Sequence, residues 1–118
     1  MLGVRAARVG EWVVLRVAGE IDLATAPHLR QSLVAEIRED QPRVVVDLSG
    51  VDFVDSTGLG VLLGGLVRAR RLGGDLRVSG LSPRLAEVFD LVDLRLVLAE
   101  PEDGIVASAD AGFDSETW

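Results

Sequence analysis

The chain of 118 residues has no cysteine, no lysine and a single histidine. Without cysteine there can be no disulfide bond, no thiolate nucleophile and no zinc site with cysteine ligands. Without lysine there can be no P-loop, in which a lysine reaches the phosphates of a nucleotide. His28 could serve a hydrolase as a base, but its place at the start of a predicted helix is that of an ordinary exposed side chain. We therefore expect no enzyme, no bound metal and no cofactor.

Long apolar segments are also absent. No stretch reaches the roughly 18 apolar residues that a membrane-spanning helix needs. Residues 1–12 contain charged side chains and no long apolar run, unlike a signal peptide. The cytoplasm is the expected compartment, and we expect no membrane association. The hydrophobic content of 48% is enough to build the core of a single domain.

Positive charge is scarce. The net charge is −7, and six of the nineteen acids lie in residues 100–118, which contain no arginine. Residues 1–99 are almost neutral. Neither part offers the basic face that binds a phosphate backbone, so we expect no direct contact with nucleic acid.

Short apolar runs separated by turn residues predict alternating strands and helices. Five strands are predicted. Residues 3–9 and 13–18 form a hairpin across Gly10-Glu11, residues 43–48 form a central strand with a continuous apolar run, and two further strands cover residues 76–79 and 96–98. Apolar residues, mostly leucines, at spacings of three and four predict three helices, over residues 25–39, 57–72 and 82–91. Thr25 and Ser82 are the expected N-caps, and the segments 20–23 and 52–55 are expected loops.

This alternation indicates an α/β domain with a mostly parallel sheet and crossover helices. We expect the domain to occupy residues 1–110, and the segment after Pro101 could begin with a last helix. Residues 111–118 are small and acidic, and we expect them to be disordered and to add little stability.

Ser56 lies where the buried strand 43–48 has ended and the next helix begins. A helix N-cap would explain a serine here without any further function. Gly58 and Gly60 are harder to explain, because glycine in a helix costs up to about 1 kcal/mol relative to alanine. Either something approaches the helix backbone closely at this point, or the helix packs tightly on the sheet.

Acidic side chains follow two strands of the predicted sheet. Glu20 and Asp22 follow one strand, and Asp52 and Asp55 follow another. Because the loops after parallel strands meet at one end of the sheet, we expect an acidic patch around Ser56.

The segment Asp55-Ser56-Thr57-Gly58-Leu59-Gly60 resembles the phosphoacceptor motif of the STAS family, the anti-sigma factor antagonists. The resemblance covers about residues 3–99, and includes Gly19-Glu20-Ile21-Asp22 and Leu85-Ala86-Glu87-Val88-Phe89. It implies a small mixed sheet of four to five strands with helices mainly on one face.

The resemblance also implies a mechanism. Ser56 corresponds to the serine that a partner kinase phosphorylates, and Asp22, Asp55, Thr57 and Gly58 join it in the partner-binding site. The expected partner is an anti-sigma factor of the histidine-kinase-like ATPase fold, which binds the unphosphorylated chain and holds the ATP and magnesium. A separate serine phosphatase would reverse the modification.

Two alternatives remain open from the sequence. The first is an enzyme that binds phosphate, because a glycine-rich turn between a strand and a helix can hold a phosphate group. The glycines at 58, 60 and 64 do not, however, match the spacing of a dinucleotide-binding motif. STAS domains also serve as scaffolds in stress-sensing complexes and as subunits of lipid-transport ATPases, with no obligatory phosphorylation switch.

Overall fold

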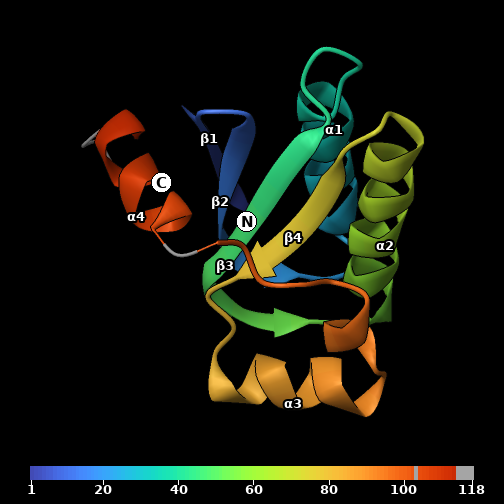
Figure 1. The fold of residues 1–118 in the computed structure, drawn as a ribbon. Helices are drawn as coiled ribbons and strands as arrows, with labels where there is room; N and C mark the ends of the chain where they lie inside the picture. The colour runs from blue at the N-terminus through green and yellow to red at the C-terminus, as the bar shows by residue number, and fades with distance from the viewer. Residues whose placement is uncertain (103, 114–118) are drawn as a thin grey trace.

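The computed structural model describes residues 1–102 and 104–113, which form one layer of sheet with helices on both faces (Figure 1). In chain order the elements are β1 (Gly3–Val9), β2 (Trp12–Ile21), α1 (Ala26–Glu36), β3 (Arg43–Val54), α2 (Ser56–Arg71), β4 (Asp75–Ser79), α3 (Pro83–Leu91), η1 (Leu94–Leu96), α4 (Ile105–Ala109) and η2 (Asp110–Gly112). Helices α1 and α2 lie side by side on one face, and α4 lies on the other. In the part of the chain that is described, no helix has both the length and the apolarity that crossing a membrane requires.

The sheet has four strands in the order β1-β2-β3-β4. β1 and β2 form the predicted antiparallel hairpin, whereas β2 with β3 and β3 with β4 are parallel. The apolar run of β3 is buried on both faces, as its composition predicts. Val44 and Val46 join the core under α1 and α2, and Val45 joins a smaller cluster on the opposite face.

Two strands are longer than predicted. β2 continues through Glu20 and Ile21, and β3 continues to Val54, where loops were expected. The pairing slips once between Arg16 and Ala18 and again between Gly19 and Glu20, then resumes in register. These bulges interrupt the alternation of apolar and polar residues from which a strand is recognised. The sheet itself therefore extends to within one residue of both Asp22 and Asp55.

The helices differ from the prediction mainly at their ends. α1 ends at Glu36 rather than Glu39, and α2 begins one residue earlier than expected. The predicted last strand is wrong. Its segment instead overlaps the 3₁₀ turn η1, and the Val78 N–H of β4 donates to the carbonyl of Ala99, directly after the segment. A run of three apolar residues does not distinguish a strand from a helical turn.

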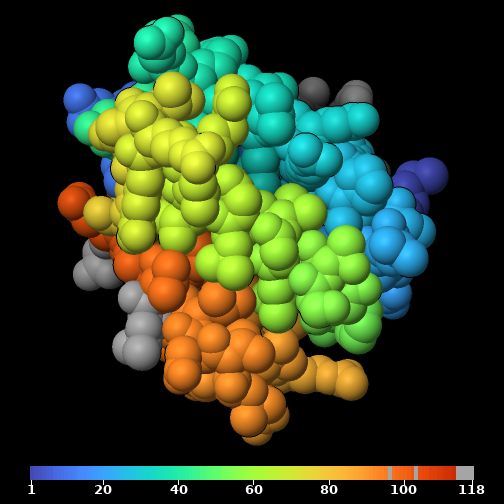
Figure 2. Space-filling model, turned by 90° about the vertical axis from the view of Figure 1, so that its right-hand side faces the viewer, coloured from blue at the N-terminus to red at the C-terminus, as the bar shows by residue number. Residues whose placement is uncertain are grey.

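The main core lies between the sheet and helices α1, α2 and α3, which share one side of the molecule (Figure 2). The predicted apolar positions supply it, with Leu59, Leu63 and Val88 only half-buried. The members of this core in the three helices are Ala26, Leu29, Leu33, Leu62, Leu66, Ala69, Leu85 and Phe89, and Ile37 joins them directly after α1. This packing fixes the direction in which α2 leaves the sheet.

The C-terminal segment covers part of the other face. Ala109 is fully buried there, Arg16 pairs with the buried Asp47 and with Asp110, and its guanidinium lies 4.3 Å from the centre of the Phe113 ring. The expected tail 111–118 falls partly outside the described residues, and of the contacts above only that of the Phe113 ring belongs to it. That these residues add little stability stays a prediction, and the contacts of Arg5 and Arg16 with the Phe113 ring argue against it.

Candidate partner-binding site

The ends of β2 and β3 lie side by side and bring the two predicted acidic loops together. Ile21 pairs with Val54 in the parallel register, and the Asp55 N–H donates to the Ile21 carbonyl at 3.0 Å. Asp22 follows immediately on one chain segment and Ser56 on the other. The loop before α1 and the first turn of α2 therefore form one continuous surface.

Asp55, not Ser56, caps α2. Asp55 has an extended backbone, and its Oδ1 accepts the Gly58 N–H at 3.0 Å. Ser56 is the first helical residue and is exposed. Among the residues described, none forms a hydrogen bond with its hydroxyl. The simple explanation of Ser56 as an N-cap is therefore wrong, and its side chain is available to a partner.

The two glycines in the first turns of α2 have different surroundings. A Cβ on Gly58 would lie 2.6 Å from Ile21 Cγ2 and 2.8 Å from Val54 Cγ1, which requires those buried side chains to move. Gly58 thus lets the helix approach the ends of β2 and β3. A Cβ on Gly60 would meet nothing within 4 Å. Gly58 is buried beneath the site, so its role is to let the first turn of α2 lie close to the sheet, and it is not itself a contact surface.

Asp22 is held in a tight turn. Its Oδ1 accepts the N–H groups of Ala24 at 2.9 Å and Thr25 at 3.0 Å. The Thr25 hydroxyl donates to the Glu20 carbonyl and accepts the Asp22 N–H, so Thr25 stabilises the preceding loop instead of capping α1 with its side chain. These hydrogen bonds lower the pKa of Asp22. The largest effect comes from the Thr25 N–H, and the Thr25 hydroxyl and the Ala24 N–H add to it. This carboxylate is ionised and oriented at neutral pH.

The expected acidic patch is present around the start of α2. Glu20 and Asp52 are exposed, and Asp22 and Asp55 are half-buried. Within residues 1–102 and 104–113, none of these four carboxylates forms an ion pair, and no cluster of acids and histidine has an arrangement that could hold a metal ion. New negative charge at this surface would therefore meet carboxylates and few neutralising groups.

Apolar side chains beside these acids were not predicted as part of the site. Leu23 in the loop before α1 is 75% exposed, and Phe53 near the end of β3 is 44% exposed. Each follows an acid directly in the sequence, a combination that a solvated loop does not require. Leu23, which lines a hollow together with Thr57, gives the surface beside Ser56 an apolar component that a partner can bury.

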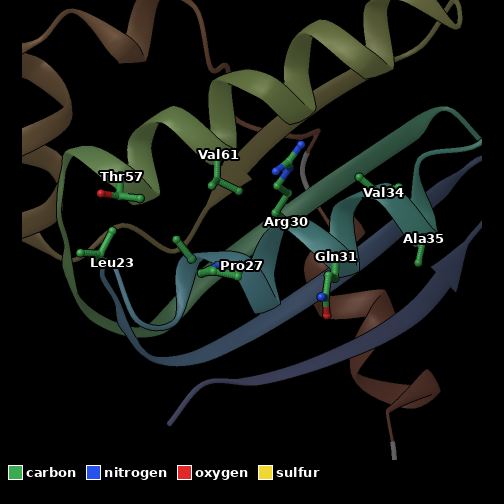
Figure 3. A pocket seen from close by; sticks show the side chains of 9 residues that line it. Leu23, Pro27, Arg30, Gln31, Val34, Ala35, Thr57 and Val61 are labelled. Atoms are coloured by element: carbon green, nitrogen blue, oxygen red, sulfur yellow. The ribbon is translucent and has the colours of Figure 1, made fainter.

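A groove between α1 and α2 begins at Thr57, next to Ser56 (Figure 3). Its wider part has a volume of about 560 Å³, and a neighbouring hollow of about 430 Å³ shares four of its lining residues, Arg30, Val34, Thr57 and Val61. Figure 3 shows Thr57 and Val61 on α2, with Arg30 rising between the helices from α1. The structure thus places the predicted Thr57 at the junction of the Ser56 surface and this groove.

A sequence model of the STAS domain matches residues 4–103. The anti-sigma-B factor antagonist of Bacillus subtilis is 36% identical over 96 residues, which cover 79% of this chain and 87% of that protein. The corresponding antagonist of Listeria monocytogenes is 40% identical over 80 residues, covering 66% and 68%. An anti-sigma factor antagonist from Mycobacterium paratuberculosis has a solved structure with a TM-score of 0.78 and 27% identity, covering 93% of this chain and 95% of that one.

The chain therefore belongs to the STAS domain family. Within that family, its similarity lies with the anti-sigma factor antagonists.

Proposed function

We propose that this chain is a phosphorylation-controlled anti-sigma factor antagonist. In its unphosphorylated form it binds an anti-sigma factor of the histidine-kinase-like ATPase fold and so releases a sigma factor. The observation that carries the proposal is the exposed Ser56 hydroxyl at the first position of α2, where Asp55 has taken over the capping role. The site acts in the cytoplasm, by binding a protein rather than by catalysis.

The partner supplies the chemistry of the switch. Its bound ATP and magnesium present a γ-phosphoryl group to the Ser56 oxygen. A new bond forms between that oxygen and phosphorus, the bond to ADP breaks, and the hydroxyl proton is released. This chain contributes the position of the acceptor, because Gly58 and the Asp55 cap fix the first turn of α2 against the sheet. A separate serine phosphatase hydrolyses the phosphoserine and restores the binding form.

The charge around Ser56 opposes the phosphorylated state only moderately in the free protein. Phosphorylation adds about −1.5 to −2 charges at neutral pH. The N-terminus of α2 favours this anion by about 0.3–1 kcal/mol, and by up to ~2 kcal/mol when it is partly buried. A carboxylate about 6 Å away opposes it by roughly 1–3 kcal/mol per unit charge at effective dielectric constants between those of water and a protein surface. Several nearby acids outweigh the helix, but an exposed phosphate relaxes into water, so the domain stays folded.

The larger effect is expected in the complex. There the phosphoryl group would be desolvated against a surface fitted to a hydroxyl and surrounded by carboxylates. A penalty of about 3 kcal/mol weakens binding more than a hundredfold, which is sufficient for a switch. Leu23 supplies apolar contact in the unphosphorylated complex, beside Thr57 and so close to the residue that controls binding.

The acceptor is tested by phosphate transfer from radiolabelled ATP in the presence of the captured ATP-binding partner. Wild-type protein is expected to incorporate one phosphate at Ser56, and Ser56→Ala none, with Ser108→Ala, exposed on α4 at the other face of the sheet, as the control that retains transfer. Normal incorporation into Ser56→Ala would move the acceptor elsewhere, with Thr57 the first residue to examine. If no ATP-binding partner is captured, the non-switching scaffold replaces this proposal.

A further inference from the structure

The groove between α1 and α2 exposes apolar side chains on both of its walls. Val34 on α1 is 47% exposed, Leu23 before the start of α1 is 75% exposed, and Val61 on α2 is half-buried. Single exposed apolar residues are ordinary, but these line one hollow of about 560 Å³. A surface of this kind gains free energy when another apolar segment covers it.

The charge of the groove differs from that of the Ser56 surface. Arg30 is the charged residue of the wider part, and among the described residues it has no hydrogen-bond or ion-pair partner. Arg68, at the far end, is already occupied, since its guanidinium donates to the carbonyls of Ile37 at 2.8 Å and Val34 at 3.4 Å. The groove therefore complements an apolar segment that carries a carboxylate, whereas the acidic patch at Ser56 complements positive charge.

We infer that the groove is a second contact for the anti-sigma factor and anchors it independently of phosphorylation. It takes a segment of that partner whose apolar side chains lie between Val34 and Val61 and whose carboxylate pairs with Arg30. This inference rests on the proposed function. Its support is the continuity of the two surfaces at Thr57 and the reversal of charge between them.

The distance along α2 makes the two contacts separable. The groove runs along α2 away from Ser56: Val61 and Gly64, which line it, are five and eight residues after Ser56, or about 7.5 and 12 Å along a helix. Only the far end of the groove lies beyond the screening length of roughly 8 Å at physiological salt, and substitutions there are expected to act additively with a change at Ser56. The groove thus sets the overall affinity, and Ser56 sets the ratio between the two phosphorylation states.

The first test uses the purified ATP-binding partner, captured and identified with the wild-type chain, in calorimetric titrations. Val34→Asp is expected to raise Kd at least tenfold, and by the same factor in the wild-type and Ser56→Asp backgrounds. Arg30→Glu is expected to weaken binding in the same way. Val67→Asp is the matched control, because Val67 is 48% exposed on α2 but does not line the groove; its Kd should stay within twofold.

A second variant separates binding from folding. A Cβ on Gly64 would meet nothing within 4 Å, so Gly64→Ala should stabilise α2 while it narrows the groove. The expected result is a higher midpoint of denaturant unfolding together with weaker binding. A merely structural role for this position would move both quantities in the same direction.

The outcomes distinguish this inference from the proposed function. If Val34→Asp and Val67→Asp bind the partner with equal Kd, the groove contact is refuted. If Ser56→Asp still binds more weakly than wild type in that case, the proposed switch stands. A loss confined to the unphosphorylated form would refute independent anchoring. A wild-type homodimer that Val34→Asp dissociates, detected by light scattering, would assign the groove to a second copy of this chain. Failure of the wild-type protein to bind any ATP-binding partner would refute the proposed function itself.

Discussion

The glycines of α2 allow a prediction in which the same substitution has opposite effects at neighbouring positions. Gly58→Ala adds a methyl group that would lie 2.6 Å from Ile21 Cγ2 and 2.8 Å from Val54 Cγ1. Ile21 is fully buried and Val54 is 5% exposed, and both are β-branched residues in paired strands. Neither can rotate away easily, so α2 must shift outwards from the sheet.

The magnitude follows from two opposing terms. Overpacking a core costs about 1–3 kcal/mol, and replacing a helical glycine by alanine returns up to about 1 kcal/mol. Gly58→Ala should therefore lower the free energy of unfolding, by up to about 2 kcal/mol when the full return is realised. Gly60→Ala meets nothing within 4 Å and should raise it by up to about 1 kcal/mol. Equilibrium urea unfolding, with the slope compared between variants, measures both values.

The contrast between the two variants is what the reasoning predicts. Gly58→Ala should also impair phosphate transfer to Ser56, because the first turn of α2 moves with the helix. If Gly58→Ala is as stable as Gly60→Ala, the close approach of α2 to Ile21 and Val54 does not determine the position of the phosphoacceptor, and this account of the site is wrong.

Three further results are expected. Asp55→Ala removes the cap of α2 and should cost about 0.5–2 kcal/mol of unfolding free energy, measured by urea unfolding; no change would mean that another group caps the helix. Arg16→Ala leaves the buried Asp47 carboxylate without its ion pair and should lower the free energy of unfolding by about 3 kcal/mol or more. Asp110→Asn breaks an exposed ion pair and should lower it by less than about 1 kcal/mol. Equal losses in the two variants would contradict this ranking. The Asp22 carboxyl should titrate in NMR below its ordinary pKa of 3.8, so that its contribution to stability is present above pH 3.8 and is lost as the pH falls through the lowered value; a midpoint at or above 3.8 would show that the turn does not favour the ionised form.

The sequence predicts the fold class because the apolar spacing of its elements is regular. Leu29, Leu33 and Ile37 place α1 against the sheet, and the continuous apolar run of β3 predicts a central strand. The ends of β2 and β3 could not be predicted, because bulges break their alternation near Gly19. The 3₁₀ turn at Leu94–Leu96 was missed because its sequence is equally compatible with a strand.

The acids and the serine of the candidate site were predicted from the sequence, but its apolar side chains were not. Asp22, Asp55 and Ser56 come together because parallel strands end at the same edge of the sheet, which the order of elements already implies. Asp55 caps α2 and leaves the Ser56 hydroxyl free because the backbone is extended at Asp55 and helical from Ser56 onward. Amino-acid composition does not determine at which of the two residues the helix begins. The groove beside Thr57 arises from the packing of α1 on α2, a long-range contact that the sequence of either helix alone does not show.

The central claim is that phosphorylation of Ser56 controls binding of the partner without unfolding the chain. The most direct measurement compares Kd for the purified anti-sigma factor between unphosphorylated protein and protein carrying phosphoserine at position 56, with circular dichroism of both forms. The account predicts at least a hundredfold weaker binding of the phosphorylated form and unchanged secondary structure. Equal affinities of the two folded forms would contradict it.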